Sequence, residues 1–595
     1  MRTKPSPPTA RGAALGWHCD GYCVATPGIP AVSIRSLTLP RKLRMDNQRL
    51  FLFVALSFVA MLIWQAWLQD YGPRPVPATT QQAQTIPAPG GVTTADVPRG
   101  AVTNTSPATA PNATMPAVQT MPADGQRVHV ISDVLDLELD TRGGDVHTAD
   151  LLAYPKEADK PDDPFQLMSD TPPDVFIAQS GLLAPGAPDH HALYNADKTD
   201  YRLADGAKNL DVRLHWQNAA GLKVDKVYTL KRGSYAITVR YEVDNGTAQE
   251  WKGRAYEQLQ HGQPPKAGHF GISTYTGGVI YSPDEKYKKI KFEDIAKQDL
   301  SRDFSGGWAA MIQHYFLGAW IPDPTLTSHY FSKALPDQRY VLGLVSPELS
   351  VPAHGKGVFT SRLYVGPKLQ DHLAHVAPGL ELTVDYGVLT FIAQPIFWLL
   401  KHIHNIVGNW GWSIILLTIL IKLAFYKLSE TSYRSMANMR KLQPRMQALK
   451  ERYGDDRQKL NTAMMEMYKK EKINPLGGCL PIVVQMPVFL SLYWVLQETV
   501  EMRQAPWILW IKDLSSADPY YILPLIMGVT MLLQQKLNPA PIDPMQAKVM
   551  MAMPFLFTVF FAFFPSGLVL YWVVNNTLSI AQQWVITKRI AGKTL

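Results

Sequence analysis

Lys422 is the residue best placed to do chemistry in this chain, because it is the only charged side chain in the apolar run Trp410–Tyr426. A charge deep in a bilayer costs roughly 3 kcal/mol on insertion scales, and it usually faces a protein interior or a wet cavity. A lone cation in such a place would attract acidic groups. We therefore take Lys422 as a candidate functional residue. The alternative is a lysine whose stem simply reaches towards the lipid headgroups.

Polar side chains in the neighbouring apolar runs could form a wet pocket around this cation. The candidates for the lining are Thr418, Gln485, Asn575 and Asn576, and further amides lie at Gln534, Gln535, Gln582 and Gln583. Such a pocket would open to the inner side of the membrane. The alternative is that these groups only form hydrogen bonds between helices, worth about 0.6–2 kcal/mol each.

Signals for catalysis and for cofactors are missing from the sequence. It contains no Gly-x-x-x-x-Gly-Lys-Ser/Thr loop, no His-Glu-x-x-His and no Gly-x-Ser-x-Gly. His190 and His191 have no carboxylate at a recognisable ligand spacing, so we interpret them as solvated loop histidines. Cys19 and Cys23 likewise have no partner at ligand spacing. We expect no catalytic residue, no metal and no cofactor.

A second pattern lies in the basic segment 428–478. Met439, Leu442, Met446 and Leu449 share one helical face. After the turn Tyr453–Asp456, a second face carries Leu460, Met464 and Met467. This spacing predicts a helical hairpin. Because methionine adapts to varied apolar partners, the hairpin could receive changing hydrophobic segments. The alternative, equally open, is that the two faces pack on each other.

The elements that must position these residues follow from how the apolar residues are distributed. The chain has 595 residues, a net charge of +8 and a hydrophobic content of 46%, concentrated near the start and after Leu389. Residues 71–126 are rich in Pro, Ala and Thr and predict a flexible linker. In residues 127–385, apolar and polar residues alternate, as in Val134–Asp140 and Tyr235–Val243. This pattern predicts a large antiparallel β-sandwich on the outer side of a membrane.

The remaining segments predict membrane helices. The run Leu50–Leu68, within a first anchor at 45–70, has ~19 residues and spans about 28 Å as a helix. Residues 386–408 predict an amphipathic helix lying at the interface, or else packed on the β domain. Residues 409–595 predict a core of spans at about 410–427, 480–500, 520–536, 550–564 and 567–586.

Charge sets the orientation of these spans. The segment Lys427–Lys472 is rich in Lys and Arg, which is typical of the cytoplasmic side. The prediction is a polytopic α-helical membrane protein with six transmembrane helices, both termini in the cytoplasm and a large periplasmic domain. Residues 1–44 match none of these patterns. We expect Met45 to be the natural start, with a disordered cytoplasmic tail as the alternative.

Short motifs along the chain resemble those of a known family, the bacterial YidC/Oxa/Alb membrane protein insertases. The matching stretches run in order from Met45 almost to the end, and residues 1–44 lie outside them. They are Met45–Arg49, Ile63–Trp67, Thr141–Asp145, Val407–Gly411, Asn474–Cys479, Gln485–Pro487, Arg503–Pro506, Asp518–Pro524 and Phe564–Tyr571.

The resemblance implies a function. Such insertases and chaperones insert and help fold newly made proteins in the bacterial inner membrane, alone or with the Sec translocon, without nucleotide hydrolysis. A hydrophilic groove open to the cytoplasm holds acidic substrate residues on a central cation. The family usually has Arg where this sequence has Lys422, so the charge is kept but the bidentate fork is lost. A second departure is Lys427, where the family commonly has Pro.

The resemblance also implies substrate contacts, partners and a fold for the large domain. The substrate slide would comprise Phe489, Met527, Leu556, Phe560, Tyr571 and Trp572. The implied partners are nascent membrane proteins, Sec translocon components, ribosome or targeting factors at the basic loop, and membrane lipids, with no recognition of nucleic-acid sequence. The periplasmic domain resembles the family's β-supersandwich, which sugar-binding enzymes share, but no sugar chemistry follows from the fold.

Two other classes of protein fit parts of the sequence. A solute transporter or channel with a periplasmic binding domain would predict inverted repeats or broken helices meeting mid-membrane, and neither is visible. A membrane-anchored carbohydrate-active enzyme would need a carboxylate or histidine pair that converges in the β domain.

Overall fold

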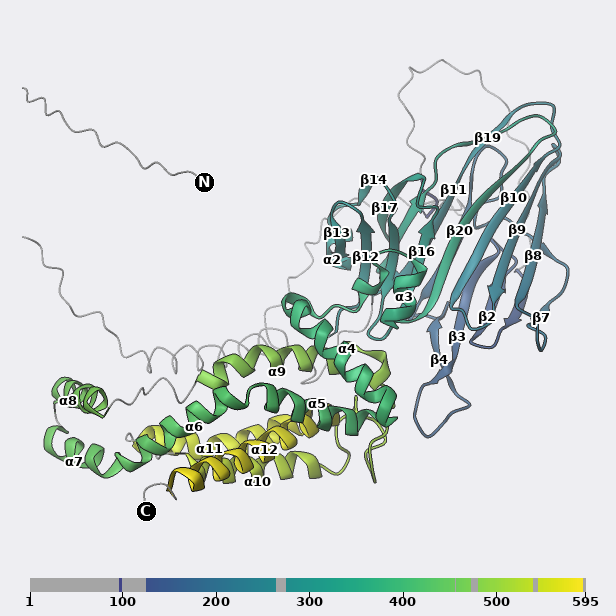
Figure 1. Ribbon diagram of the computed structural model, residues 1–595. Helices are drawn as coiled ribbons and strands as arrows, with labels where there is room; N and C mark the ends of the chain where they lie inside the picture. The colour runs from purple at the N-terminus through teal and green to yellow at the C-terminus, as the bar shows by residue number, and fades with distance from the viewer. Residues whose placement is uncertain are drawn as a thin grey trace, which may run out of the picture. The chain divides into compact units, whose positions relative to one another are not determined.

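A computed structural model describes residues 96–98, 125–263, 274–454, 456–471, 480–538 and 544–591 (Figure 1). Strands fill the first part of this range, and helices fill the part after Gln370. The predicted anchor Leu50–Leu68, most of the linker and residues 1–44 lie outside the described residues.

Two large sheets form the strand-rich part. The first has eleven strands: β1 (Arg127–Ile131), β2 (Leu135–Asp140), β3 (Asp145–Pro155), β4 (Pro164–Met168), β5 (Phe176–Leu183), β7 (Asp200–Arg202), β11 (Trp251–Gly262), β14 (Ser301–Ser305), β17 (Thr327–Leu335), β18 (Arg339–Val345) and β19 (Leu349–Val351). The second has nine: β6 (Asn195–Ala196), β8 (Asn209–Gln217), β9 (Leu222–Lys231), β10 (Ala236–Asn245), β12 (Gly277–Ser282), β13 (Lys286–Ile290), β15 (Trp308–Ile312), β16 (Phe316–Pro322) and β20 (Lys356–Pro367).

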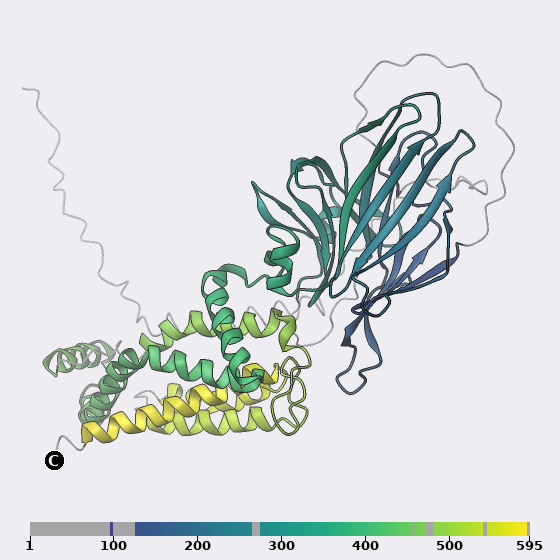
Figure 2. The ribbon, with the colours of Figure 1, turned by 45° about the vertical axis from the view of Figure 1, so that its right-hand side comes forward.

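The predicted alternation of apolar and polar residues is confirmed in these sheets. Along β10, Ile237, Val239, Tyr241 and Val243 are buried, while the residues between them are more exposed. Apolar side chains from both sheets meet in one core, and Figure 2 shows the strands in two layers. Among the described strands the pairing is antiparallel, except that β1 and β7 run parallel. The antiparallel β-sandwich is therefore the fold of this region.

A buried ion pair joins the two sheets inside this core. The ammonium of Lys226, on β9, lies 3.1 Å from Oδ1 of Asp145 on β3, and both side chains are almost fully buried. Lys226 also donates hydrogen bonds to the carbonyl oxygens of Gly143 (2.8 Å) and Ser180 (3.2 Å). All three acceptors lie across the sandwich from β9. Burial nevertheless lowers the pKa of Lys226.

The helical part follows. After α2 (Phe292–Ile295), inserted among the strands, its helices are α3 (Gln370–Val376), α4 (Thr390–Val407), α5 (Trp410–Ala424), α6 (Tyr426–Lys441), α7 (Gln443–Tyr453), α8 (Arg457–Lys470), α9 (Leu480–Glu498), α10 (Ile522–Leu537), α11 (Pro544–Phe561) and α12 (Ser566–Ala591). Short 3-10 turns are η1 (Leu380–Thr383), η2 (Gly387–Leu389) and η4 (Val500–Met502). A second apolar core joins α4, α5, α9, α10 and α12. In Figures 1 and 2, α5, α9, α10 and α12 lie alongside one another, while α4 crosses α5 and α9.

Local sequence signals set several helix ends. Gly408 ends α4 with a φ of 71°, a conformation that glycine adopts without strain. Asn409 then caps α5 by accepting a hydrogen bond from the backbone N–H of Trp412 at 3.1 Å. Asp456 caps α8 in the same way, through the backbone N–H groups of Gln458 and Lys459.

The amphipathic helix predicted at 386–408 forms as α4, and it packs on other helices. Its buried residues Ile396, Phe397, Leu400 and Ile403 join the core shared with α5 and α9. Its opposite face leaves large apolar side chains exposed, namely Phe391, Trp398 and Ile406. The position of this helix at a membrane surface stays a prediction.

Within the described residues, no single helix is both long and apolar enough to cross a membrane. α5 and α6 together pass by length and composition, but they are bent by 68° at the break between them. The bend falls directly after the run that contains Lys422, and the sequence did not predict it. The count of six spans therefore stays a prediction.

Candidate functional site

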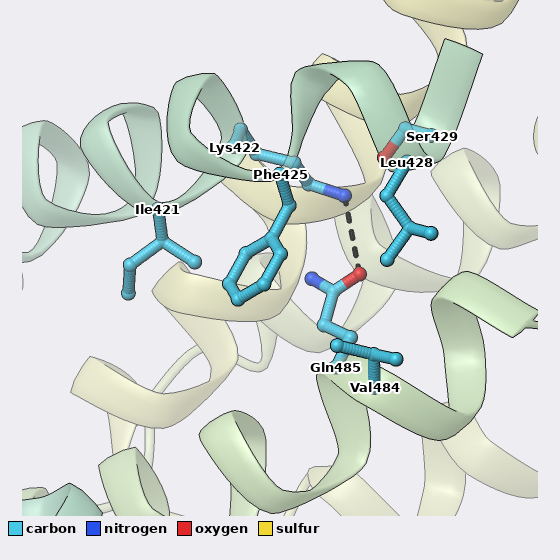
Figure 3. A pocket seen from close by; sticks show the side chains of 7 residues that line it. All are labelled: Ile421, Lys422, Phe425, Leu428, Ser429, Val484 and Gln485. Carbon is cyan, nitrogen blue, oxygen red and sulfur yellow. Dashed lines mark hydrogen bonds between the residues drawn. The ribbon is translucent and has the colours of Figure 1, made fainter. Parts of the chain in front are cut away.

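Lys422 lies in the last turn of α5, with its side chain half-buried among three other helices. Its ammonium donates a hydrogen bond to Oγ of Ser579 on α12 at 2.8 Å, and a longer one to Oε1 of Gln485 on α9 at 3.5 Å (Figure 3). In the part of the chain that the structure describes, no carboxylate forms an ion pair with Lys422. The cation is therefore held by neutral groups only.

A chain of amides continues from this cation. The side-chain NH2 of Gln485 donates to Oδ1 of Asn575 at 2.6 Å, so Gln485 accepts from Lys422 and donates to Asn575. Ser579 Oγ donates to the backbone oxygen of Asn575 at 2.7 Å. Asn576 instead donates to Oγ1 of Thr530 on α10 at 3.3 Å. The amides thus form hydrogen bonds between helices and also line a cavity, while a water-filled pocket that opens to the inner side of a membrane stays a prediction.

These residues face a cavity of about 410 Å³. Eight of the predicted residues line it: Lys422, Gln485, Gln534, Asn575, Asn576, Phe489, Tyr571 and Trp572. The rest of the wall is mixed, with serines and amides beside five methionines: Met436, Met486, Met531, Met550 and Met553. A smaller hollow adjoins it between α5, α6 and α9, lined by Ile421, Phe425, Leu428 and Val484 around Lys422 and Gln485 (Figure 3). The arrangement places the ammonium of Lys422 in a wall where polar and apolar side chains are mixed.

The aromatic members of the wall contact one another. The rings of Phe489 and Trp572 meet edge to face with centroids 4.9 Å apart, and Phe489 stacks on Tyr571 at 6.0 Å. The indole N–H of Trp572 is buried and has no hydrogen-bond partner among the described residues. Tyr571 is fully buried, so it supports this wall more than it presents a surface.

Four predicted site residues do not line the cavity. Thr418 is buried and donates to the backbone oxygen of Ile414, one turn back in α5, at 2.7 Å. Met527 is fully buried within α10. On α11, Leu556 is 61% exposed and Phe560 is 48% exposed, so both point out of the bundle. The predicted slide is therefore split between the cavity wall and the outer face of α11.

Other residues of the cavity were missed by sequence reasoning. Ser579, the nearest partner of Lys422, is four residues after Asn575 on α12, so helical spacing could have found it. α6 contributes Ser429, Ser432, Tyr433 and Met436. The sequence places these residues in the basic segment, because nothing in their pattern shows that α6 packs against α9 and α12.

The described residues of 428–478 contain α7, α8 and most of α6, and α7 and α8 pack side by side. The first face of the predicted hairpin is divided between two helices, because Met439 lies on α6 and Met446 on α7. Met446 is buried, and the hydroxyl of Tyr468 lies 3.6 Å from its sulfur, so this methionine serves the packing of the two faces. Met439, Met464 and Met467 are only half-buried. Met465, which the pattern did not single out, is exposed.

The interpretation of His190 and His191 as solvated loop histidines is wrong for His190. Its side chain is 1% exposed, and Asp96 lies against both histidines. Asp96 precedes His190 by 94 residues and His191 by 95 residues. No local spacing in the sequence could therefore reveal the contact between Asp96 and the two histidines.

Comparison with known proteins divides the chain, as the fold does, into a largely strand-rich part and a helical part. Residues 127–399 match the family described as YidC periplasmic domain, and residues 402–593 match the family described as 60Kd inner membrane protein. Together these two matches define the class: an inner-membrane protein with a periplasmic β domain.

Individual relatives are similar over nearly the whole chain. Membrane protein insertase YidC from Thioalkalivibrio sulfidiphilus is 53% identical over 568 residues, which cover 92% of this chain and 100% of that protein. The insertase from Alkalilimnicola ehrlichii is 52% identical, with 92% and 97% covered. A solved structure of an active YidC insertase with its first transmembrane domain resolved is 18% identical, at a TM-score of 0.36, with 77% of this chain and 94% of that chain covered. The chain belongs to the YidC family of membrane protein insertases.

Proposed function

We propose that this chain inserts newly made membrane proteins into the bacterial inner membrane through the groove around Lys422. One observation carries the mechanism: a half-buried ammonium, bound only by Ser579 and Gln485 among the described residues, faces a cavity of about 410 Å³. Membership in a family of insertases supports the overall function. The groove, its mechanism and its partners are our proposal.

The cation would act on acidic residues of a passing substrate tail. Two unit charges 4 Å apart interact by ~1 kcal/mol in bulk water and by ~4 kcal/mol at an effective dielectric constant near 20. Lys422 uses two of its three N–H donors on Ser579 and Gln485, so an approaching carboxylate can bind the third donor without replacing these bonds. An attraction of this size is favourable but shallow, which suits a group that must release its substrate.

The polar wall would lower the cost of moving a hydrophilic tail. Gln485, Asn575 and Asn576 offer hydrogen bonds within the bundle, so the tail meets polar groups and water before it meets hydrocarbon. A bilayer that is wetted from one side is a thinner barrier. The tail would then cross only the remaining apolar part.

The apolar part of the substrate would slide along the outer faces of two helices. On α10, Leu525, Ile526 and Val529 are exposed. On α11 the exposed residues include Met551, Phe555, Leu556, Val559 and Phe560, and Phe563 is exposed in the turn that follows. A continuous exposed apolar surface of this kind marks a contact with lipid or with another apolar segment. Phe489 and Trp572 would lead from the cavity towards it.

We further propose six spans with both termini in the cytoplasm, the first at Leu50–Leu68. Basic residues on α6, α7 and α8 support a cytoplasmic position for this segment, among them Arg440, Lys441, Arg445, Lys450 and Arg452. This basic surface would meet the ribosome or targeting factors, and the half-buried methionines of the hairpin would receive the substrate first. Action beside the Sec translocon is part of the same proposal.

The test is insertion by the purified full-length chain in liposomes. A single-span substrate with an acidic tail should become protected from added protease only when the chain is present. In the same liposomes, the leakage of a small trapped solute should not change. Solute flux without substrate protection would support a transporter and contradict the proposal.

A further inference from the structure

Asp96, His190 and His191 form a compact cluster that the insertion mechanism does not use. Oδ2 of Asp96 lies 3.0 Å from Nε2 of His190, and its Oδ1 lies 3.1 Å from Nε2 of His191. One ligand atom from each of the three residues falls within 4.8 Å of the others. Two imidazole nitrogens and a carboxylate oxygen therefore point at one small volume.

The fold holds both histidines in place. They follow β5 in a turn in which Oδ1 of Asp189 accepts the backbone N–H of His191 at 2.9 Å. Tyr256, a buried residue of β11, contacts His190 twice. Its hydroxyl is 2.5 Å from Nδ1 and accepts the backbone N–H at 3.0 Å. The far nitrogen, Nε2, is thereby directed at Asp96, as an outer partner orients a metal-binding histidine.

Asp96 is held as well. The side-chain NH2 of Gln258, also on β11, donates to the backbone oxygen of Asp96 at 3.3 Å. His190 is 1% exposed, Asp96 is 22% exposed and His191 is 39% exposed. The site is thus closed on the side of the sheet and reachable by solvent beside His191.

We propose that Asp96, His190 and His191 bind a zinc ion, which ties the segment around Asp96 to the β domain. Two histidines, one carboxylate and a water are a common tetrahedral ligand set for zinc. Ligand atoms at zinc distances of 2.0–2.1 Å lie about 3.3 Å apart in a tetrahedron, and each imidazole nitrogen here lies near that distance from one oxygen of Asp96, His190 from Oδ2 and His191 from Oδ1. With one ligand atom from each residue, all three atoms lie within 4.8 Å of one another. Imidazole nitrogens disfavour calcium and magnesium, which prefer oxygen ligands.

The competing arrangement is a clasp of hydrogen bonds without an ion, with Asp96 accepting from both imidazoles. In the zinc site each histidine contributes a nitrogen ligand to the ion, whereas in the clasp each histidine donates a hydrogen bond to Asp96. The segment around Asp96 precedes the first strand of the domain, so an ion here would join parts of the chain 94 positions apart.

The experiment uses the full chain in detergent without a polyhistidine tag, treated with a chelator and then titrated with zinc. The expected result is about one tightly bound zinc per chain by elemental analysis, with cobalt in its place giving the visible absorption of a tetrahedral site. His191→Gln removes a partly exposed ligand and should weaken zinc binding ~10-fold or more. His190→Gln should do the same.

His215→Gln is the matched control. His215 also contacts two carboxylates, Asp225 at 2.8 Å and Asp197 at 3.2 Å, but through opposite ring nitrogens, so the three do not share one point. Its replacement should leave zinc binding unchanged. The proposal is overturned if the parent chain holds no stoichiometric zinc, or if His191→Gln binds zinc as the parent does. Either result would leave the clasp of hydrogen bonds.

Discussion

The charge of Lys422 should determine how fast substrates with acidic tails are inserted. A tail carboxylate that reaches the position of Ser579 Oγ would lie within about 4 Å of the ammonium, where the attraction is ~1 kcal/mol in water and ~4 kcal/mol at a dielectric constant near 20. Lys422 is half-buried beside a cavity, so we take about 2 kcal/mol between these limits. Lys422→Ala should then slow insertion of an acidic-tail substrate by roughly 30-fold.

The assay is protease protection in liposomes, run with paired substrates whose tails carry Asp or Asn at one position. Lys422→Arg should insert both substrates nearly as the parent does, since the charge is kept and only the donor geometry changes. Lys422→Glu should reverse the preference in favour of a tail that carries Lys. Lys427→Ala, an exposed lysine five residues further on, is the matched control and should change neither substrate. Equal insertion of the acidic-tail substrate by Lys422→Ala and the parent would refute the electrostatic role.

Three further predictions concern stability, each measured as unfolding of the full-length chain in detergent. Lys226→Met leaves the buried carboxylate of Asp145 without its partner and should lower the free energy of unfolding by about 3–5 kcal/mol. Lys223→Met, on the exposed face of β9, should lower it little, and equal losses from the two substitutions would contradict this account. Burial raises the pKa of Glu257 to about 7, from 4.5. As pH rises from 4.5 to about 7, Glu257 loses its proton in the unfolded chain but keeps it in the folded protein. The free energy of unfolding therefore falls over this pH range, by roughly 3 kcal/mol in total. Glu257→Gln should remove this fall, and an unchanged pH profile would contradict the assignment. A Cβ on Gly528 would meet the hydroxyl of Thr558 on α11, so Gly528→Ala should destabilise the bundle by about 1–3 kcal/mol, while the neighbouring exposed Val529→Ala should not.

The sequence predicts the local part of this structure well. The alternation in Tyr235–Val243 identifies β10, and the apolar run that starts at Trp410 identifies α5. The structure adds the caps of α5 and α8, Asn409 and Asp456, each of which acts on its own helix. Lys422 stands out because a charge in an apolar run has few structural explanations. Gln485 and Asn575 follow from the same rule, and both line the cavity with Lys422.

Non-local contacts were beyond the sequence. The bend between α5 and α6 brings Ser429, Ser432 and Tyr433 into the cavity, although their composition is that of a solvated loop. Asp96 meets His190 across 94 positions. The ion pair of Lys226 and Asp145 depends on which strands face each other across the sandwich. Each of these contacts is decided by packing between elements, which period and propensity do not encode.

The end of α5 also explains how Lys422 is held with no acidic partner among the described residues. Lys422 lies in the last turn of α5, which ends at Ala424, and the last carbonyl groups there carry the negative end of the helix dipole. A cation in this turn gains about 0.3–1 kcal/mol, or more when partly buried, and Ser579 and Gln485 add two hydrogen bonds. A resident carboxylate would hold the ammonium more firmly, but it would also neutralise it and compete with any acidic tail. Partial charges and neutral acceptors stabilise the lysine while leaving its full charge free to act on a passing substrate.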